Sequence, residues 1–381
     1  MWALIVISGI LLVIYCLLII CYTWWFNRLH PFTSDRKIEK YARFCIIIPA
    51  RDEEQNIGKC LQSILENNYP LDAYEILVID DHSTDATPNI IREFSSKYNN
   101  VRLFKMAELI NGQQLNSYKK KAIEIAVSHT QAEWIITTDA DCIVGKHWLE
   151  SYNEFIQEKE AVFIAAPVSF IDDGSFTSKF QCLDFLSLQG ITAASVSAGI
   201  HSMCNGANLC YKKTAFEAVG GFAGVDKLAS GDDMFLMYKI LKQFPQQVKY
   251  LFSKEAIVQT LPMPDWKSFF NQRIRWASKA SSYQDKRMIV VLAWVYLFNL
   301  SFLLLFATGF LNSVAWKYML LFLLIKYIVE LIFMYLVAKF YQQQSLIKWF
   351  GVMQPFHVAY TLLAGALGKI GVYKWKGRSV K

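Results

Sequence analysis

The hydrophobic residues of this chain are concentrated at its two ends, and that distribution limits the folds open to it. Residues 2–26 are almost entirely apolar, and so are residues 288–310 and 316–340. About 20 apolar residues suffice for a helix to span a bilayer. The sequence therefore predicts a membrane anchor before an ordinary globular middle, and a membrane hairpin after it.

A further apolar stretch, from about 349 to 372, is interrupted by polar residues and leads into a basic tail. Basic residues also follow the first apolar run, at Arg28, Arg36, Lys37, Lys40 and Arg43. The positive-inside rule then puts the amino terminus outside and the middle of the chain in the cytoplasm. No basic region precedes the first run and no small-residue cleavage site ends it, which favours an anchor over a signal peptide. For the last stretch, a re-entrant or interface-lying segment is favoured over a full crossing, because it keeps the basic tail inside.

The amino-acid composition limits the kinds of binding partner that we expect for this chain. Hydrophobic residues make up 54% of the chain, and the net charge is +7 with the basic residues beside the apolar ends. That arrangement suits an anionic membrane surface. No patch of basic and aromatic residues tracks along a helix or strand, so nucleic acid is not an expected partner. The eight cysteines show no CxxC spacing and no clustering with histidine, which favours reduced, mostly buried thiols over disulfides or zinc.

The middle of the chain alternates short β-branched runs with amphipathic helices. Helical periodicity is clear at residues 57–65 and 89–98, and the expected strands are residues 44–49, 75–79, 101–104, 134–138 and 162–166. Apolar strands separated by helices predict an α/β fold with a parallel sheet covered on both faces. Ligands of such sheets bind at the carboxyl ends of the strands.

Acidic residues follow these predicted strand ends. The first strand runs into Pro49-Ala50-Arg51-Asp52-Glu53-Glu54, which is typical of a loop over a polar ligand or of a helix start rich in acids. The second leads into Asp80 and Asp81, adjacent carboxylates that are costly to bury without donors or a cation.

The fourth strand ends in Asp139-Ala140-Asp141. Residues two apart on an extended chain point the same way, so both carboxylates can share one hard cation such as Mg²⁺ or Mn²⁺. A lone pair with this spacing is weak evidence, but its convergence with two other acidic strand ends makes it strong.

Two later segments allow a functional and a structural interpretation each. Asp232 and Asp233 open an amphipathic helix, either as acids at its positive end or with one of them as a general base. Gln272, Arg275 and Trp276 are spaced i, i+3 and i+4 and share a helix face. Arginine suits a diphosphate and tryptophan a sugar ring, although an interfacial tryptophan among basic residues has the same pattern.

Taken in order, these segments resemble the inverting GT-A-fold glycosyltransferases of family 2, which include cellulose, chitin and hyaluronan synthases and ceramide glucosyltransferase. The resemblance covers about residues 44–276 and implies a GT-A (Rossmann-like), mostly parallel sheet with helices on both faces, flanked by transmembrane helices. The expected domains are an anchor at 1–27, a cytoplasmic catalytic domain at 40–260, an interface helix at 261–287, a hairpin at 288–340 and a last membrane or re-entrant segment at 345–381.

The resemblance also implies roles for the residues. Asp233 would be the general base, and Asp141 with Asp139 would hold the metal. Donor binding would fall to Pro49, Glu53, Asp80, Asp81, Lys121 (or Lys120), Asp139, Gln272 and Arg275, and acceptor binding to Gly206, Asp232 and Trp276. Two positions depart from the family pattern: Asp52 stands where asparagine is common, and Asp232 where glutamate is usual.

These features predict a membrane enzyme that moves a sugar from a nucleotide-sugar, with UDP favoured by resemblance only, to a lipid or lipid-linked acceptor. We expect it in a bacterial-type inner membrane with the catalytic domain facing the cytoplasm. Three or four spans are few for a secretion channel, which places processive polysaccharide synthesis second. A non-catalytic nucleotide-sugar-binding protein is a distant alternative. Lys326 and Glu330, four residues apart in one predicted span, would either line an acceptor groove or form a structural pair.

Overall fold

The computed structural model describes residues 1–33, 40–110, 115–200, 203–226, 228 and 230–369, with the backbone of two short strands, β10 (Tyr373–Trp375) and β11 (Arg378–Val380). Arg36, Lys37 and the side chains of the basic tail lie outside the described residues. The chain divides into two compact units. The sheet unit comprises His30–Phe170, Ser202–Leu261 and Lys374–Lys381, and the helical unit comprises Met1–Leu29, Ile171–His201 and Pro262–Tyr373.

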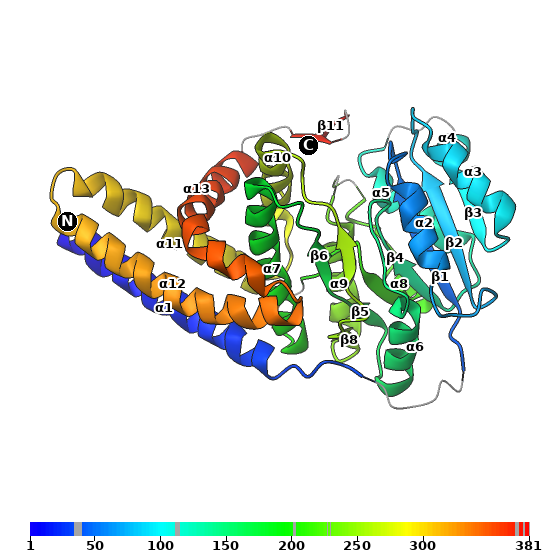
Figure 1. Cartoon of the computed structure of the whole chain (residues 1–381), viewed down its shortest axis with the longest axis horizontal. Helices are drawn as coiled ribbons and strands as arrows, with labels where there is room; N and C mark the ends of the chain where they lie inside the picture. Colours follow the sequence, from blue (N-terminus) through cyan, green and yellow to red (C-terminus); the bar gives the residue numbers. More distant parts are fainter. Residues whose placement is uncertain are drawn as a thin grey trace. The chain divides into compact units, whose positions relative to one another are not determined.

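The sheet unit is built on seven strands in the order β3-β2-β1-β4-β7-β5-β8 (Figure 1). Their bounds are β1 (Phe44–Ala50), β2 (Tyr74–Asp80), β3 (Val101–Lys105), β4 (Trp134–Thr137), β5 (Phe163–Ala165), β7 (Leu209–Lys212) and β8 (Val248–Tyr250). Strand β7 runs antiparallel to β4 and β5, and the other neighbouring pairs are parallel. The predicted α/β class with a mostly parallel sheet is confirmed.

Both faces of this sheet are covered. The first five residues of β1 and the last five of β2 are all buried, and successive residues of a strand point to opposite faces. The connecting helices are α2 (Ile57–Leu65), α3 (Thr87–Lys97), α4 (Met106–Leu109), α5 (Tyr118–Ser128), α6 (Trp148–Glu158), α8 (Lys213–Ala218) and α9 (Asp232–Gln243). A second, two-stranded sheet pairs β6 (Val168–Phe170) with β9 (Val258–Thr260), neither of which was predicted.

The strand order brings the predicted acidic loops to one edge. Strands β2 and β3 lie on one side of β1, and β4 lies on the other, so the direction of the strand order changes at β1. Open α/β sheets bind ligands at such a switch point. Ala50 is paired with Asp80, and Ile47 with Thr137. The loops after β1, β2 and β4 therefore start side by side.

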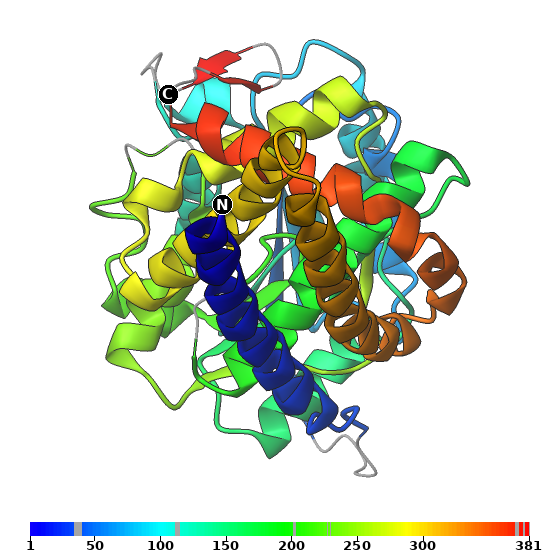
Figure 2. The ribbon, with the colours of Figure 1, turned by 90° about the vertical axis from the view of Figure 1, so that its left-hand side faces the viewer.

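The helical unit contains the apolar ends of the chain. Helices α1 (Trp2–Asn27), α11 (Lys286–Gly309) and α12 (Val314–Phe340) pack on one another (Figures 1 and 2). Helices α7 (Phe176–Ser197), α10 (Trp266–Ala277) and α13 (Phe350–Gly368) pack beside them, with the short η1 (Ala280–Ser282) and η2 (Gln344–Trp349) in the connections.

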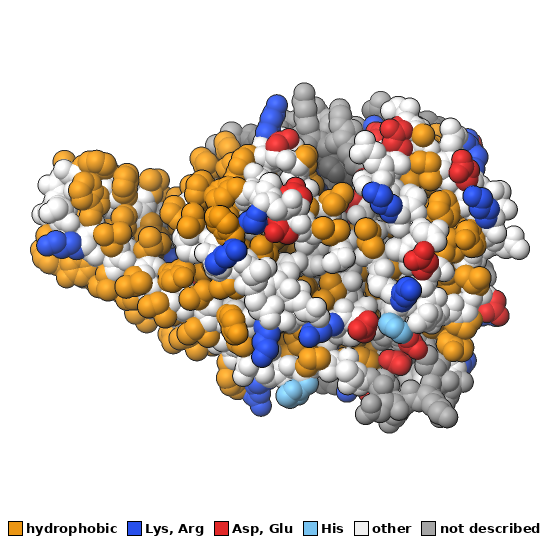
Figure 3. All heavy atoms as spheres, in the orientation of Figure 1, with side chains coloured by type: hydrophobic (Ala, Val, Ile, Leu, Met, Phe, Trp, Pro, Cys, Tyr) orange, Lys and Arg blue, Asp and Glu red, His pale blue; other side chains and the backbone are white. Residues whose placement is uncertain are grey.

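Four helical segments of the described chain are long and apolar enough to cross a membrane: α1, α11, α12 and Gln344–Gly368. Large apolar side chains face outward along them, among them Val6, Leu17, Leu304, Leu321 and Val352. Figure 3 shows hydrophobic side chains gathered over the surface of these helices. Such outward apolar surface has no counterpart on an ordinary soluble domain. The re-entrant interpretation of the last segment stays a prediction.

A buried polar network joins three of these helices. Lys326 of α12 lies with its Nζ 2.8 Å from Oε2 of Glu330 and 2.6 Å from Oε1 of Gln354. Gln354 of α13 donates to Glu330 at 2.7 Å, and the hydroxyl of Tyr15 of α1 donates to the same carboxylate. Both charges are satisfied inside the bundle, so the network favours a structural pair over an acceptor groove.

Replacing Glu330 with glutamine removes the charge that Lys326 faces and is expected to lower thermal stability. Removing one partner of a buried ion pair typically costs about 3–5 kcal/mol, because the other charge stays buried and unpaired. Thermal unfolding in detergent measures the loss, and Lys326→Met combined with Glu330→Gln should recover most of it. Unchanged stability in Glu330→Gln together with altered activity would favour the acceptor groove instead.

Candidate active site

One lysine ammonium lies between carboxylates from two other parts of the sheet unit. Lys119 Nζ is 2.7 Å from Asp139 Oδ1 and 3.5 Å from Asp232 Oδ2. The lysine comes from the first turn of α5, Asp139 follows β4, and Asp232 is the first residue of α9. Burial opposes the charge of Lys119, but the two carboxylates outweigh burial and raise the pKa of this lysine. The cluster thus holds a permanent cation among acids.

The neighbouring lysines of the same run lie elsewhere. Lys121, to which the resemblance gave donor binding, has its ammonium 3.6 Å from Glu124 on the surface. Lys120 is almost fully buried and donates to the backbone carbonyls of Val225, Leu228 and Ser230 at 2.6, 2.6 and 3.2 Å. Successive helix residues are about 100° apart, so only one of three adjacent lysines can reach the carboxylates. Of these three lysines, Lys119 is the one whose ammonium lies beside Asp139 and Asp232.

Lys120 has a supporting role that the sequence pattern did not reveal. Its three bonds hold the carbonyl groups of Val225, Leu228 and Ser230, shortly before Asp232 and Asp233, and its burial lowers the pKa of this lysine. Gly231, at φ 81°, then turns the chain into α9, a conformation that favours glycine. The position of the two aspartates therefore depends on a buried lysine and a glycine.

Asp233 is held by two backbone donors. Its Oδ2 accepts from the Gly206 N–H at 3.1 Å, and its Oδ1 accepts from the Met234 N–H at 2.8 Å. A Cβ added to Gly206 would lie 3.2 Å from Lys119 Nζ and 3.3 Å from Asp232 Oδ2, which is tighter than ordinary contact. Gly206 is thus placed against the cluster where a larger residue would displace its charged groups.

Asp141 lies among like charges on the β1 and β4 side of the edge. Burial raises its pKa to about 6, and the nearby carboxylates of Asp139 and Glu53 add to that effect. No three histidine, cysteine or acidic side chains within the described ranges gather closely enough to hold a metal alone. Mg²⁺ and Mn²⁺ sites commonly use one or two carboxylates and complete their coordination with water and phosphate oxygens. The Asp139 and Asp141 carboxylates fit such a partial ligand set.

Asp80 and Asp81 end β2 on the other side of β1. Asp80 is 5% exposed; burial raises its pKa, and the Ser83 N–H donates to its Oδ1 at 3.3 Å. Asp81 Oδ1 lies 2.9 Å from His82 Nδ1 and 3.9 Å from Arg51 Nη1. An ionised carboxylate has about four acceptor positions, so Asp80 can receive further hydrogen bonds from a ligand.

The loops after β1 and β2 are tied to each other. Asp52 adopts φ 50°, and its Oδ1 accepts from the Thr84 N–H at 2.8 Å, while its own N–H donates to Ser83 Oγ at 3.0 Å. Aspartate and asparagine both tolerate this left-handed conformation, and both offer a side-chain oxygen. Aspartate at this position therefore keeps the loop geometry that asparagine gives.

Gln272, Arg275 and Trp276 belong to α10 of the helical unit and are described within it. Gln272 Oε1 accepts from Arg273 Nη1 at 2.8 Å, and the Trp276 ring centre lies 4.2 Å from the Arg273 guanidinium carbon. The predicted donor and acceptor residues therefore come from both units: Gly206, Asp139, Asp232 and Asp233 gather in the sheet unit, and these three lie together on α10.

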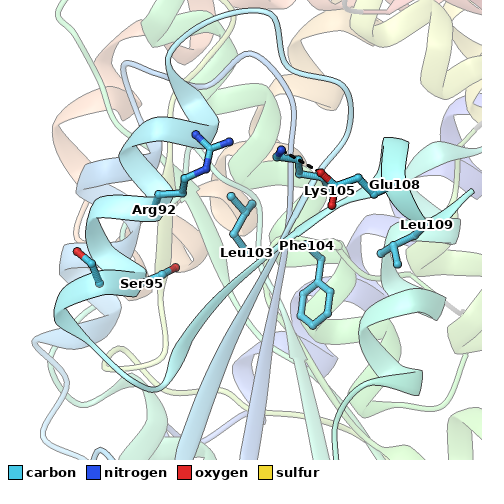
Figure 4. Close-up of a pocket in the computed structure, with 8 residues that line it drawn as sticks. Arg92, Ser95, Leu103, Phe104, Lys105, Glu108 and Leu109 are labelled. Atoms are coloured by element: carbon cyan, nitrogen blue, oxygen red, sulfur yellow. Dashed lines mark hydrogen bonds and ion pairs between the residues drawn. The ribbon is translucent and has the colours of Figure 1, made fainter.

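A separate hollow of about 450 Å³ lies between α3, β3 and α4 (Figure 4). Its lining includes Arg92, Phe104 and the ion pair of Lys105 with Glu108, whose Nζ and Oε1 atoms are 3.0 Å apart. None of the predicted site residues lines it. The acidic cluster at the strand ends, rather than this hollow, is the candidate active site.

Comparison with known families shows to which family the chain belongs. A family model described as "Glycosyl transferase family 2" matches residues 45–220, and one described as "Glycosyl transferase family group 2" matches residues 134–366. The second covers more than half of the chain. The chain belongs to the family 2 glycosyltransferases.

Relatives of this glycosyltransferase differ in what their names say they make. Glycosyltransferase AglE of Haloferax volcanii is 28% identical over 189 residues, 50% of this chain and 58% of the relative. A beta-monoglucosyldiacylglycerol synthase of Synechocystis is 30% identical over 117 residues, 31% of this chain and 23% of the relative. A poly-beta-1,6-N-acetyl-D-glucosamine synthase of Staphylococcus epidermidis is 25% identical over 254 residues, 66% of this chain and 57% of the relative. The chain thus matches less than two thirds of the length of each.

Among solved structures, the mannosyltransferase PcManGT of Pyrobaculum calidifontis, in complex with GDP-Man and Mn²⁺, matches with a TM-score of 0.59 and 18% identity. The match covers 96% of this chain and 99% of the other. At this identity the likeness concerns the fold, and it agrees with the GT-A class expected from the motifs.

Replacing Lys119 with methionine should lower glycosyl transfer about tenfold or more, because hydrogen bonds to charged groups are worth about 1.5–3 kcal/mol. Lys121→Met is the matched control from the same helix, and its rate of transfer should stay close to that of the parent protein. Initial rates and thermal unfolding of both variants provide the comparison. Loss of transfer in Lys121→Met alone would return the donor-binding role to that residue.

Proposed function

We propose that this glycosyltransferase moves one sugar from a nucleotide-sugar to a lipid or lipid-linked acceptor at a membrane, by metal-assisted inverting displacement. The observation that carries the proposal is the placement of Asp233. Its carboxylate is fixed by the N–H groups of Gly206 and Met234, close to the lysine and aspartate cluster at the strand ends. A carboxylate held in this way is ready to accept a proton at a defined position.

The nucleoside would bind over the ends of β1 and β2. Pro49 lies near the end of β1 and Glu53 follows the strand. The buried Asp80, with Asp81, offers acceptors to the N–H groups of a base. Hydrogen bonds between the loops after β1 and β2 help to hold these groups in place. A UDP-sugar is the favoured donor, and a GDP-sugar, the kind of donor in the PcManGT complex, is the alternative.

Asp141 and Asp139 would hold Mg²⁺ or Mn²⁺ together with the diphosphate oxygens of the donor. When bound, such a cation neutralises the charge that develops on the leaving diphosphate. Lys119 would contribute a second positive charge from within the cluster, in place of the Lys121 that the resemblance suggested. Gln272 and Arg275 keep their expected role in diphosphate binding, and Trp276 in acceptor binding.

In the proposed reaction, a hydroxyl of the acceptor attacks the anomeric carbon as Asp233 takes its proton. The bond from that carbon to the diphosphate breaks on the opposite face, so the configuration inverts. Asp232, beside Lys119, and Gly206 would shape the acceptor side of the cluster. A single fixed base with one proton to accept is sufficient for this displacement.

The acceptor is inferred to be a lipid or to carry one. Four apolar helical segments with outward-facing apolar side chains would hold the enzyme in a membrane, beside such molecules. The beta-monoglucosyldiacylglycerol synthase relative has a lipid product by name. We infer an inner-membrane enzyme whose catalytic domain faces the cytoplasm, where nucleotide-sugars are made.

Processive synthesis is the second candidate, favoured by the match to a poly-beta-1,6-N-acetyl-D-glucosamine synthase over 66% of this chain. One experiment separates the two. Detergent-purified protein is incubated with UDP- or GDP-sugars and Mg²⁺ or Mn²⁺, with and without membrane lipids, and products are weighed by mass spectrometry. A lipid that gains one sugar supports single transfer, a ladder of masses supports a synthase, and no diphosphate release from any donor would contradict both.

Asp233→Asn should lower turnover by about 10²–10⁴-fold, the range that general base catalysis contributes. Nucleoside diphosphate binding should be preserved, because the base acts on the acceptor. Rate measurements and calorimetric titration with UDP and Mn²⁺ check the two halves of this statement. Asp72→Asn, on the surface of the same unit, is the control. Full activity in Asp233→Asn would exclude it as the base.

Asp141→Asn should instead remove the dependence of donor binding on metal. In the parent protein, EDTA should weaken UDP binding and Mn²⁺ should restore it, since the carboxylate and the diphosphate share the cation. In the variant, UDP affinity with and without Mn²⁺ should become similar. A variant that still responds to Mn²⁺ as the parent does would exclude Asp141 as a metal ligand.

A further inference from the structure

We propose that Asp184 and Arg273 are positioning residues that hold Gln272 and Trp276 in the orientation the reaction needs. This inference rests on the proposed function of the Gln-x-x-Arg-Trp motif. It concerns two residues that lie outside the motif's specified positions, one of them on a different helix. All of the contacts that carry it lie within the helical unit.

Asp184 and Arg273 form a buried, two-point ion pair. Asp184 is in α7, Arg273 in α10, and Asp184 Oδ2 accepts from Arg273 Nε at 3.0 Å and from Nη2 at 2.6 Å. The side chains are 2% and 4% exposed. Charges this deeply buried persist only when they are paired and hydrogen-bonded. The pair therefore fixes the guanidinium plane relative to α7.

The same guanidinium also contacts two residues of the motif. Arg273 Nη1 donates to Gln272 Oε1 at 2.8 Å, and the guanidinium carbon lies 4.2 Å from the Trp276 ring centre. The Phe269 ring also contacts this guanidinium, with its centre 4.7 Å from the guanidinium carbon. One buried cation thus contacts both the first and the last residue of the motif.

The contact with Gln272 determines which end of its amide is free. Arginine only donates, so the amide group that faces Arg273 must be the carbonyl oxygen. The NH₂ group of Gln272 is then the end directed away from Arg273. That end donates hydrogen bonds, which suits the oxygens of a diphosphate or a sugar. If Gln272 flipped, it would present an acceptor to the anionic ligand and lose the bond to Arg273.

Helix geometry explains why two arginines so close in sequence differ. Residues two apart on a helix point about 200° apart, so Arg273 and Arg275 face different surroundings. Arg273 is buried with Phe269 on the face of α10 that packs inward, and Arg275 is only half-buried. Arg273 is therefore suited to support the motif, and Arg275 remains the arginine suited to contact a ligand.

A third helix joins the same carboxylate. The hydroxyl of Tyr360 in α13 donates to Asp184 Oδ1, and His357 Nε2 lies 3.8 Å from that oxygen. Further along α13, a Cβ added to Gly368 would lie 2.9 Å from the Ala277 Cβ at the end of α10. Helix α13 therefore packs closely on α10 and shares the hydrogen bonds of Asp184, which makes this aspartate the point where three helices meet.

The test combines substitutions on both sides of the pair. Asp184→Asn removes the charge that orients Arg273, and Arg273→Lys keeps the charge but loses the donor to Gln272 and the flat group against Trp276. Each should lower kcat about tenfold or more, because misplacement of a positioned group by about 1 Å can cost about 100-fold. Arg273→Lys preserves an ion pair with Asp184, so it keeps the test valid if Asp184→Asn folds poorly.

A double-mutant cycle separates positioning from stability. Gln272→Ala should lower transfer by itself, and Asp184→Asn should lower transfer less in the Gln272→Ala background than in the parent protein, since the effects of residues that act through a shared contact are not additive. The effect that remains in that background would act through Trp276. Glu330→Gln is the matched control, because it breaks another buried ion pair of the same unit without touching α10. Its effect should appear in thermal stability and be additive with Gln272→Ala.

The outcomes distinguish this inference from the function it rests on. If Gln272→Ala abolishes transfer while Asp184→Asn and Arg273→Lys retain the parent kcat, the positioning role is overturned and the function of the motif stands. Full additivity of Asp184→Asn with Gln272→Ala would also overturn it. If Gln272→Ala and Trp276→Ala both leave transfer unchanged, the proposed function of the motif fails, and this inference fails with it.

Discussion

The ammonium group of Lys119 lies between carboxylates that would otherwise repel one another at the carboxyl edge of the sheet. Asp139 and Asp232 reach it from the end of β4 and the start of α9, at 2.7 and 3.5 Å. Parallel strands bring their ends to one edge, so the fold itself concentrates these acids. Lys119 does not compensate every carboxylate of the cluster. Burial, with the carboxylates of Asp139 and Glu53, raises the pKa of Asp141 to about 6. Under the proposed function, the cation that binds with the donor diphosphate would supply the positive charge that Lys119 gives only to part of the cluster.

Hydrogen bonds within the chain hold the loops around this cluster. The loops after β1 and β2 exchange hydrogen bonds through Asp52, Ser83 and Thr84, and Asp52 takes a left-handed conformation that few residues adopt. Lys120 fixes the approach to α9 through three carbonyl groups. Groups that need no rearrangement before the reaction lower its barrier more effectively than groups that must be ordered by the substrate.

The sequence predicted the parts of this fold whose signals are long or repeated. Strand β1 was expected at residues 44–49 and spans Phe44–Ala50, because an uninterrupted β-branched run is buried on both faces. Strands β6 and β9, of three residues each, carry no periodicity that could have revealed them. The choice among three adjacent lysines depended on where α5 begins, since one residue turns the side chain by about 100°. Asp184 has no motif around it, and only the packing of α7 on the other helices gives it a partner.

Two buried ion pairs in the described part of the helical unit differ in where their remaining hydrogen bonds go. In the network of Lys326 and Glu330, the remaining hydrogen bonds return to side chains of the same bundle, Gln354 and Tyr15. That network closes on itself and joins α1, α12 and α13. The guanidinium of Arg273 has more donors than Asp184 accepts, and the surplus donor goes to Gln272. Lysine could replace the charge of Arg273 but not its planar group with donors on several sides. An arginine at this buried position can therefore join helices and orient a neighbouring residue at once, which a closed pair such as Lys326 and Glu330 does not do.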